Sequence, residues 1–178
     1  MLNQLLLWSM LLAPLASLFL LDKDSLKYYM PAAVFTALLV TMIHEVGYYF
    51  QWWVIHEAVV PWGRIASPSV TLGLFFVGTL WIIYFTYRNL LSYMITQTVF
   101  NGVFAFLVVP HVLEPRGIAR YVHMHPAILW LLGIALAFVI YRYQKWQEGA
   151  LVPLKRPKKK ETVVIDMQHW LSRKQRIR

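Results

Sequence analysis

The chain has 178 residues, of which 59% are hydrophobic and only 14% are charged, and its formal net charge is +9 at pH 7. Eleven of the seventeen Lys and Arg lie between Arg142 and Arg178, whereas a soluble domain spreads charge over its whole surface. This pattern excludes an ordinary soluble domain and favours a membrane protein over a nucleic-acid-binding protein. The absence of cysteine excludes disulfides, thiolate metal sites and a cysteine nucleophile.

Five apolar stretches follow one another along the chain, each close to the roughly 20 residues that a helix needs to cross a bilayer core. Because unpaired backbone groups are costly in lipid, we expect each stretch to be helical. The third and fourth stretches are joined only by Tyr87-Arg88-Asn89, which predicts a tight antiparallel hairpin. The predicted spans are residues 2–21, 31–53, 69–87, 90–110 and 126–143.

Prolines mark the ends of these predicted helices. Pro31, Pro68 and Pro126 are expected in the first turn of the second, third and fifth spans, where a missing N–H costs nothing. Pro110 is expected to close the fourth span. Pro14 falls inside the first span and predicts a kink there.

The distribution of charge predicts the direction in which the helices cross. No basic residue precedes the first span, and Lys23 and Lys27 follow it, which favours a retained helix over a signal peptide. Segments rich in Lys and Arg stay in the cytoplasm, so we expect the N-terminus outside and the C-terminus inside. The predicted fold class is an all-α integral membrane protein of the cell membrane. It has a five-helix transmembrane domain over residues 1–146 and a basic cytoplasmic tail over residues 147–178.

Polar residues inside the second and fourth spans form the first candidate site. A charged side chain at membrane depth usually faces the bundle interior and has a partner there. We therefore expect Glu45 to hydrogen-bond to Asn101 or Gln97, within a buried network that also includes His44 and Tyr48. One interpretation is that these groups hold the helices together. The other is that they handle protons or ions, or bind a small ligand.

Histidines and carboxylates gather in the predicted outer loops and form a second candidate site. Imidazole and carboxylate suit Zn²⁺ or a similar divalent ion. However, neither His44-Glu45 nor His56-Glu57 is followed by the second histidine of a zinc-protease motif, and no cofactor motif is present. Ordinary interfacial histidines are the alternative. The weak metal-ligand candidates are His56, His111, Glu114, His123 and His125.

The tail after the fifth span combines a basic cluster with apolar residues at helical spacing. Basic clusters beside a span are attracted to anionic lipid headgroups, and a short amphipathic helix around Trp170 would lie in the interface beside them. A solvated topology signal or a docking site for a cytoplasmic protein is the alternative. The residues expected to contact lipid are Lys155, Arg156, Lys158, Lys159, Lys160 and Trp170.

Several short stretches resemble a known group of proteins. Lys27-Tyr28-Tyr29-Met30-Pro31, residues 43–50, Val60-Pro61-Trp62-Gly63 and residues 77–82 are similar to segments of uncharacterised small multi-span membrane proteins of spore-forming Gram-positive bacteria. The similarity covers about residues 20–110. It implies a location in the plasma membrane and carries no catalytic residue over to this chain.

Three classes of function follow from these patterns. The first is a non-enzymatic accessory, sensory or assembly component with a structural polar core. The second is a protein that handles a small ligand, an ion or protons through His44 and Glu45. The third is a metal-assisted membrane enzyme with its site on the outer face. Membrane lipids are the expected partners, together with a membrane-protein partner or a second copy of the chain, and no nucleic acid is expected.

Overall fold

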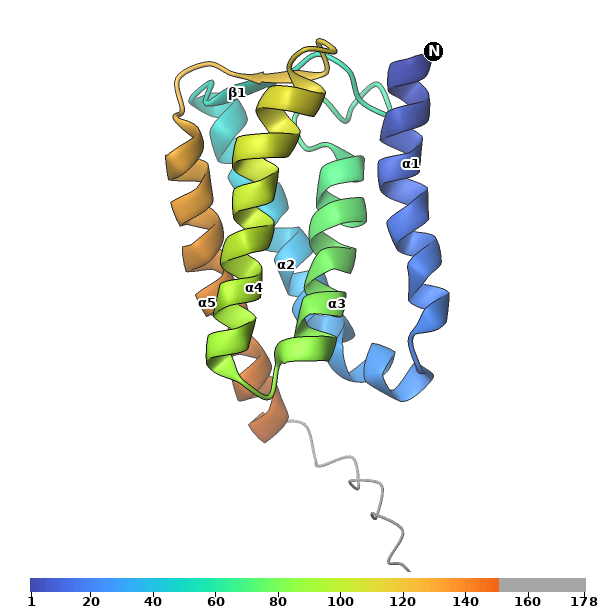
Figure 1. Cartoon of the computed structure of the whole chain (residues 1–178), viewed down its shortest axis with the longest axis vertical. Helices are drawn as coiled ribbons and strands as arrows, with labels where there is room; N and C mark the ends of the chain where they lie inside the picture. Colours follow the sequence, from blue (N-terminus) through green and yellow to red (C-terminus); the bar gives the residue numbers. More distant parts are fainter. Residues whose placement is uncertain (151–178) are drawn as a thin grey trace, which may run out of the picture. The chain divides into compact units, whose positions relative to one another are not determined.

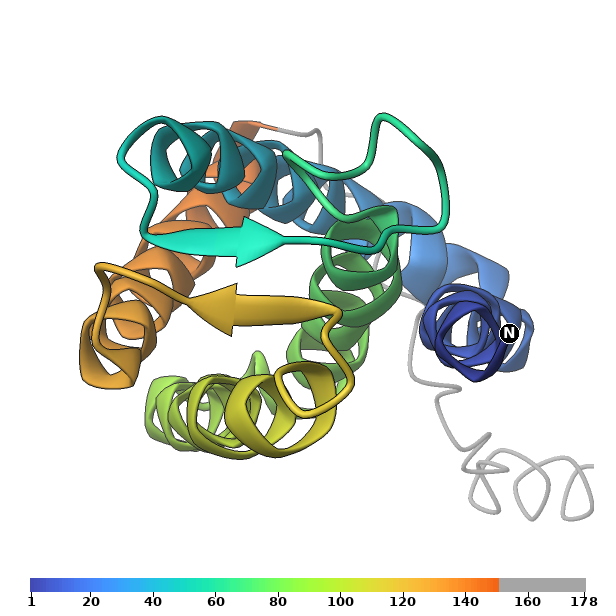
Figure 2. The same ribbon diagram turned by 90° about the horizontal axis from the view of Figure 1, so that it is seen from above.

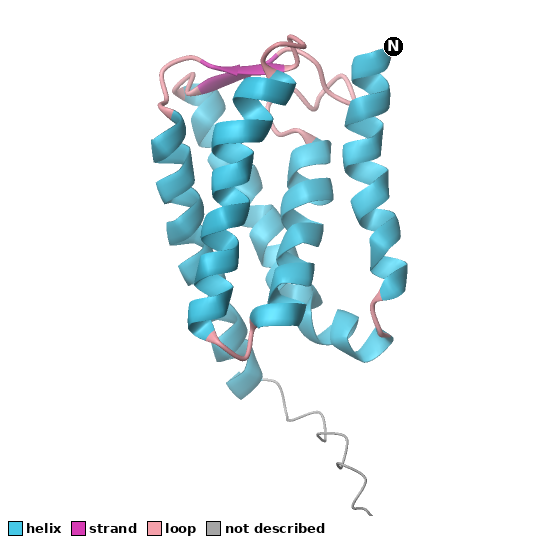
Figure 3. Cartoon of the chain, in the orientation of Figure 1, coloured by secondary structure: helices cyan, strands magenta, loops and turns pink. Residues whose placement is uncertain are grey.

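The computed structural model describes residues 1–150, which contain five helical segments long and apolar enough to cross a membrane (Figures 1 and 3). Two of these segments combine an α-helix with a wider helix of the π type, and one ends in a 3₁₀ turn. Two short strands lie in the connections between the helical segments. The elements are α1 (Leu2–Ser17), η1 (Leu18–Leu20), α2 (Lys23–Tyr49), β1 (Trp53–Ile55), η2 (Ser69–Phe76), α3 (Val77–Thr86), α4 (Leu90–Gly102), η3 (Val103–Leu113), β2 (Ala119–Tyr121) and α5 (Pro126–Ala150).

The five predicted spans are confirmed as helices, but the second begins earlier than expected. It starts at Lys23 rather than at residue 31, because the Asp22 carboxylate caps it by accepting a hydrogen bond from the Ser25 backbone N–H at 2.9 Å. The same hydrogen bond lowers the pKa of Asp22. Pro31 therefore lies inside α2, and its predicted place in the first turn was wrong.

The helices run between two ends of the bundle that differ in structure. The sheet end carries the N-terminus, the two strands and their loops, whereas the hairpin end carries the turn between α3 and α4 (Figure 1). The predicted hairpin is confirmed. Its turn ends at Asn89, whose side chain caps α4 by accepting from the N–H groups of Leu91 and Ser92.

The two strands form a small antiparallel sheet that lies across the sheet end of the bundle (Figure 2). Trp53 pairs with Tyr121, and Ile55 pairs with Ala119. The second predicted span included β1, and neither strand was predicted. Each has only three residues, too few for an alternating pattern to stand out in the sequence.

The first helix packs closely against η2 at one glycine. Pro14 lies inside α1 and has no N–H to give to the carbonyl of Met10, one turn earlier. Gly73 approaches this carbonyl so closely that an added Cβ would overlap it. Ser69 adds a hydrogen bond from its hydroxyl to the carbonyl of Leu7 at 2.8 Å. Small residues on η2 thus let α1 dock on the bundle.

Candidate ligand-binding cavity

The polar residues of α2 divide between the inside and the outside of the bundle. His44 is only 8% exposed, whereas Glu45 is exposed on the bundle surface. The prediction that Glu45 reaches Asn101 or Gln97 was therefore wrong. Neighbouring residues point about 100° apart around a helix, so Glu45 can lie outside the buried stripe of α2 that contains His44. That stripe consists of Ala32, Ala33, Thr36, Val40, His44 and Gly47.

Tyr48 also lies outside the predicted network, because it is 56% exposed. Trp53 of the sheet, rather than Tyr48, packs against His44. The indole of Trp53 meets the imidazole of His44 edge to face, and it packs so closely on Gly47 that an added Cβ would lie 2.5 Å from the ring. The last turn of α2 is thus covered by the sheet rather than by its own tyrosine.

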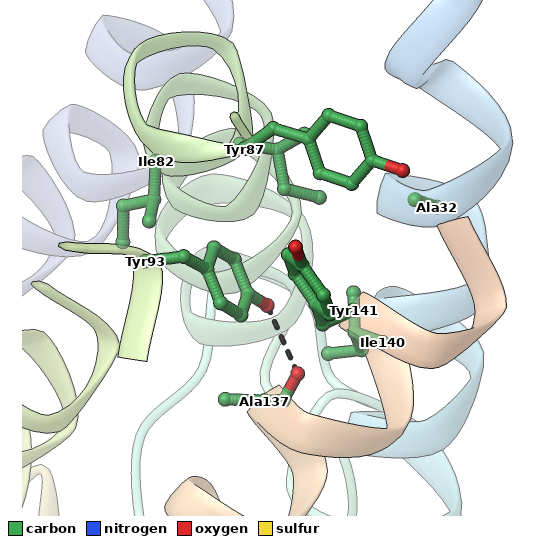
Figure 4. Packing of buried hydrophobic residues seen from close by; sticks show 8 residues of the cluster. Ala32, Ile82, Tyr87, Tyr93, Ala137, Ile140 and Tyr141 are labelled. Atoms are coloured by element: carbon green, nitrogen blue, oxygen red, sulfur yellow. Dashed lines mark hydrogen bonds between the residues drawn. The ribbon is translucent and has the colours of Figure 1, made fainter. Parts of the chain in front are cut away.

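Gln97 and Asn101 of α4 are buried as predicted and bond mainly along their own helix. The Asn101 side-chain amide donates to the carbonyl of Gln97 at 2.8 Å, and the amide of Gln97 donates to the hydroxyl of Tyr93 at 3.4 Å. Tyr93 in turn donates to the carbonyl of Ala137 on α5 at 3.1 Å (Figure 4). The sequence interpretation missed Tyr93, although its four-residue spacing from Gln97 and Asn101 could have revealed it.

A cavity of about 80 Å³ lies between these helices and the sheet. His44 and Asn101 both border it, and most of its other lining residues are apolar. Every helical span except the first contributes to its wall, and both strands contribute too. The lining residues are Val40, Ile43, His44, Trp53, Ile55, Val70, Phe75, Asn101, Phe104, Val109, Leu113, Ala119, Arg120, Tyr121, Leu129, Leu132, Gly133 and Leu136.

The sheet forms the roof of this cavity. Side chains alternate along a strand, so the paired Trp53 and Tyr121 share one face of the sheet with Ile55 and Ala119. All four border the cavity. The Tyr121 hydroxyl donates to the carbonyl of Ala105 at 3.0 Å, which ties the roof to η3. Burial raises the pKa of Tyr121.

The wide helices η2 and η3 form two walls of the cavity. At the end of η3 the N–H of Glu114 bonds to the carbonyl of Val109, five residues back. Pro110 lies inside η3 rather than at its end, so the prediction that it closes the fourth span was wrong. Helices of this width are uncommon and occur frequently at functional sites. Here they carry Val70 and Phe104 to the cavity wall.

The candidate metal ligands at the sheet end do not come together. His56, His111, Glu114, His123 and His125 are all exposed. Within residues 1–150, no group of three or more such side chains is placed to hold a metal ion. Two of the imidazoles instead bond to nearby backbone: His123 to the carbonyl of Gln51 and His125 to the N–H of Ala127. The predicted outer metal site is therefore not assembled in the described residues.

The remaining predicted residues, Lys155 through Lys160 and Trp170, lie outside the part of the chain that the structure describes. No protein-family model, no curated protein and no solved structure matches the chain. The similarity to membrane proteins of spore-forming bacteria and the contact of the tail with lipid therefore stay predictions.

Proposed function

We propose that the chain is a multi-pass protein of the cell membrane, with the sheet end outside and the hairpin end in the cytoplasm. Large apolar side chains on the outer faces of the helices support a lipid environment, including Leu38, Met42, Leu131 and Phe138. The positive-inside rule supports the direction. Lys23, Lys27 and Arg88 belong to the hairpin end, and the basic tail follows α5. The loops of the sheet end carry Arg64 and Arg116, and strand β2 carries Arg120.

Within this membrane domain, we propose that the cavity binds a small, mainly apolar ligand and that the protein is a non-catalytic sensory or accessory component. The observation that carries this proposal is an apolar cavity of about 80 Å³ bordered by a buried imidazole. Protein interiors rarely leave a void larger than a water molecule. A cavity of about 150 Å³ takes up benzene, so this one suits a ligand of a few non-hydrogen atoms or the end of a longer chain.

The lining favours binding over catalysis. General acid–base catalysis requires groups that exchange a proton with the substrate, commonly an acid and a base in one site. His44 borders the cavity, but its described lining contains no carboxylate with which His44 could form such a pair. Glu45, the carboxylate expected to serve in ion or proton handling, is exposed on the surface of the bundle. These features support ligand binding rather than ion handling or metal-assisted catalysis.

A pair of neighbouring leucines on α5 provides the test. Leu132 borders the cavity, whereas Leu131 is 58% exposed on the outer face. Wild type in lipid nanodiscs is heated with increasing 1,1,1-trifluorobutane. This molecule is larger than benzene, so its ethyl end is expected to enter the cavity while the trifluoromethyl group stays at the mouth. Because a ligand that binds only the folded state stabilises it, we expect the unfolding temperature to rise by several degrees near saturation.

Leu132→Phe fills the cavity and should abolish this rise, while the matched variant Leu131→Phe should keep it. If the three proteins respond alike, the hydrocarbon acts through the lipid and the proposed function is wrong.

A further inference from the structure

We infer that the cavity selects an uncharged ligand that donates a hydrogen bond, such as the hydroxyl of a short-chain alcohol, to the free acceptor of His44 or of Asn101. This inference rests on the proposed ligand-binding function and specifies the chemistry of the ligand. Both residues border the cavity and are more than nine-tenths buried. Each residue has one side-chain atom without a hydrogen-bond partner in the described part of the chain, Nε2 in His44 and Oδ1 in Asn101, and both atoms are acceptors.

The protonation of His44 is fixed by its own helix. Its Nδ1 lies 2.8 Å from the carbonyl oxygen of Val40. A carbonyl can only accept, so Nδ1 carries the proton, and in the neutral ring Nε2 is left with a lone pair. Among the described residues no hydrogen bond to Nε2 is present. A donating ligand would give this acceptor a hydrogen bond that the apolar wall of the cavity does not offer.

The side chain of Asn101 is oriented by Gln97. Both hydrogens of the Asn101 amide are directed to Gln97, since Nδ2 lies 2.8 Å from its backbone carbonyl and 3.5 Å from its side-chain oxygen. The Oδ1 atom of Asn101 therefore faces away from this turn. It lies against Gly133 of α5, where an added Cβ would overlap it. Within residues 1–150 no donor reaches this oxygen, so it is the second free acceptor.

The same groups disfavour charged ligands. A carboxylate has only acceptor oxygens, which would face the lone pairs of Nε2 and Oδ1. A cation would lose its water shell where the described lining offers no carboxylate. Arg120 also borders the cavity, but it is exposed and alternates with Ala119 and Tyr121 along β2, so its side chain belongs to the outer face of the sheet. An alcohol has the required donor and an apolar body for the remaining wall.

Two probes of the same shape separate recognition of the donor from simple filling of the cavity. Both 3,3,3-trifluoropropan-1-ol and 1,1,1-trifluorobutane can be followed by fluorine NMR, and they differ by a hydroxyl in place of a methyl. Their dissociation constants are measured for wild type, His44→Phe and Asn101→Leu in nanodiscs. Glu45→Gln is the matched control, because Glu45 neighbours His44 in sequence but is exposed.

A hydroxyl has one hydrogen to donate, so loss of the acceptor that it uses should weaken binding of the alcohol by about three- to tenfold in one of the two variants, His44→Phe or Asn101→Leu. Binding of the hydrocarbon should change by less than about twofold, and Glu45→Gln should bind both probes as wild type does. For each variant, the ratio of the dissociation constants of the two probes removes the general effect of the substitution on the cavity.

If neither variant loses more affinity for the alcohol than for the hydrocarbon, the inference about the donor is wrong while the cavity remains a binding site. If wild type binds neither probe saturably, the proposed function itself fails. If neither variant folds, the inference is tested with wild type and a third probe, 3,3,3-trifluoropropyl methyl ether, which can accept a hydrogen bond but cannot donate one. This ether should bind more weakly than the alcohol. Equal affinity of the ether and the alcohol would overturn the inference.

Discussion

The imidazole of His44 and the indole of Trp53 meet edge to face beneath the sheet, with ring centroids 5.5 Å apart and planes inclined by 70°. His44 belongs to a helix and Trp53 to a strand, so this contact joins the polar group of the cavity to its roof. Gly47 makes the contact sterically feasible, because it leaves room for the indole one turn after His44. The shape of the cavity therefore depends on a glycine that does not border it.

Substitution of Gly47 tests this dependence. A Cβ added at this position would lie 2.5 to 2.9 Å from ring atoms of Trp53, so Gly47→Ala must displace the indole. We expect the free energy of unfolding to fall by about 1–3 kcal/mol and the Trp emission to shift to the red. Gly149→Ala is the control, since nothing lies within 4 Å of its added Cβ. Thermal unfolding and fluorescence of the two variants should differ clearly, and equal behaviour would contradict the packing of Trp53.

The placement of Glu45 outside the bundle predicts a mild effect of its removal. Glu45→Gln should change the free energy of unfolding by less than about 0.5 kcal/mol, as surface substitutions usually do. Asn101→Ala should cost about 1–3 kcal/mol, because it breaks a buried hydrogen bond and enlarges the cavity. Denaturation in mixed micelles compares the two. A larger loss for Glu45→Gln than for Asn101→Ala would restore the buried-carboxylate hypothesis.

The roof of the cavity should loosen at high pH. Burial raises the pKa of Tyr121 in the folded protein above its ordinary value of about 10. Its contribution to stability is therefore complete below about pH 10 and is lost as the pH rises through the folded-state pKa.

Tyr121→Phe removes both this pH dependence and the hydrogen bond to Ala105, with a cost of about 0.5–1.5 kcal/mol at neutral pH. Unfolding temperatures of wild type and variant from pH 8 to pH 11 should converge. A constant difference would show that the phenol titrates as it does in the unfolded chain.

The orientation is testable because the chain contains no cysteine. Arg64→Cys, in a loop of the sheet end, should react with a membrane-impermeant maleimide in intact cells. Arg88→Cys, in the turn of the hairpin end, should react only after the cells are opened. The reverse labelling would invert the proposed topology, and labelling of both in intact cells would exclude a fixed orientation.

The helices could be predicted from the sequence because their length and apolar composition are properties of continuous segments. The cavity could not, because it depends on contacts between distant residues. Gly47 has no sequence feature that links it to Trp53, and three-residue strands carry too little pattern to be recognised. The burial of Gln97 and Asn101 was predicted from their spacing on α4. The direction of Glu45 was not, because the second span is apolar on both faces and its buried side is set by the neighbouring helices.

The most direct test of the proposed ligand-binding cavity is a measurement of how many molecules of a small apolar probe bind saturably to each chain. Fluorine NMR titration of 1,1,1-trifluorobutane into protein-containing nanodiscs, corrected for partition into empty ones, reports the number of saturable sites. We expect one site per chain in wild type and in Leu131→Phe, and none in Leu132→Phe. Only non-saturable uptake in wild type, or a saturable site that persists in Leu132→Phe, would contradict a binding site in this cavity.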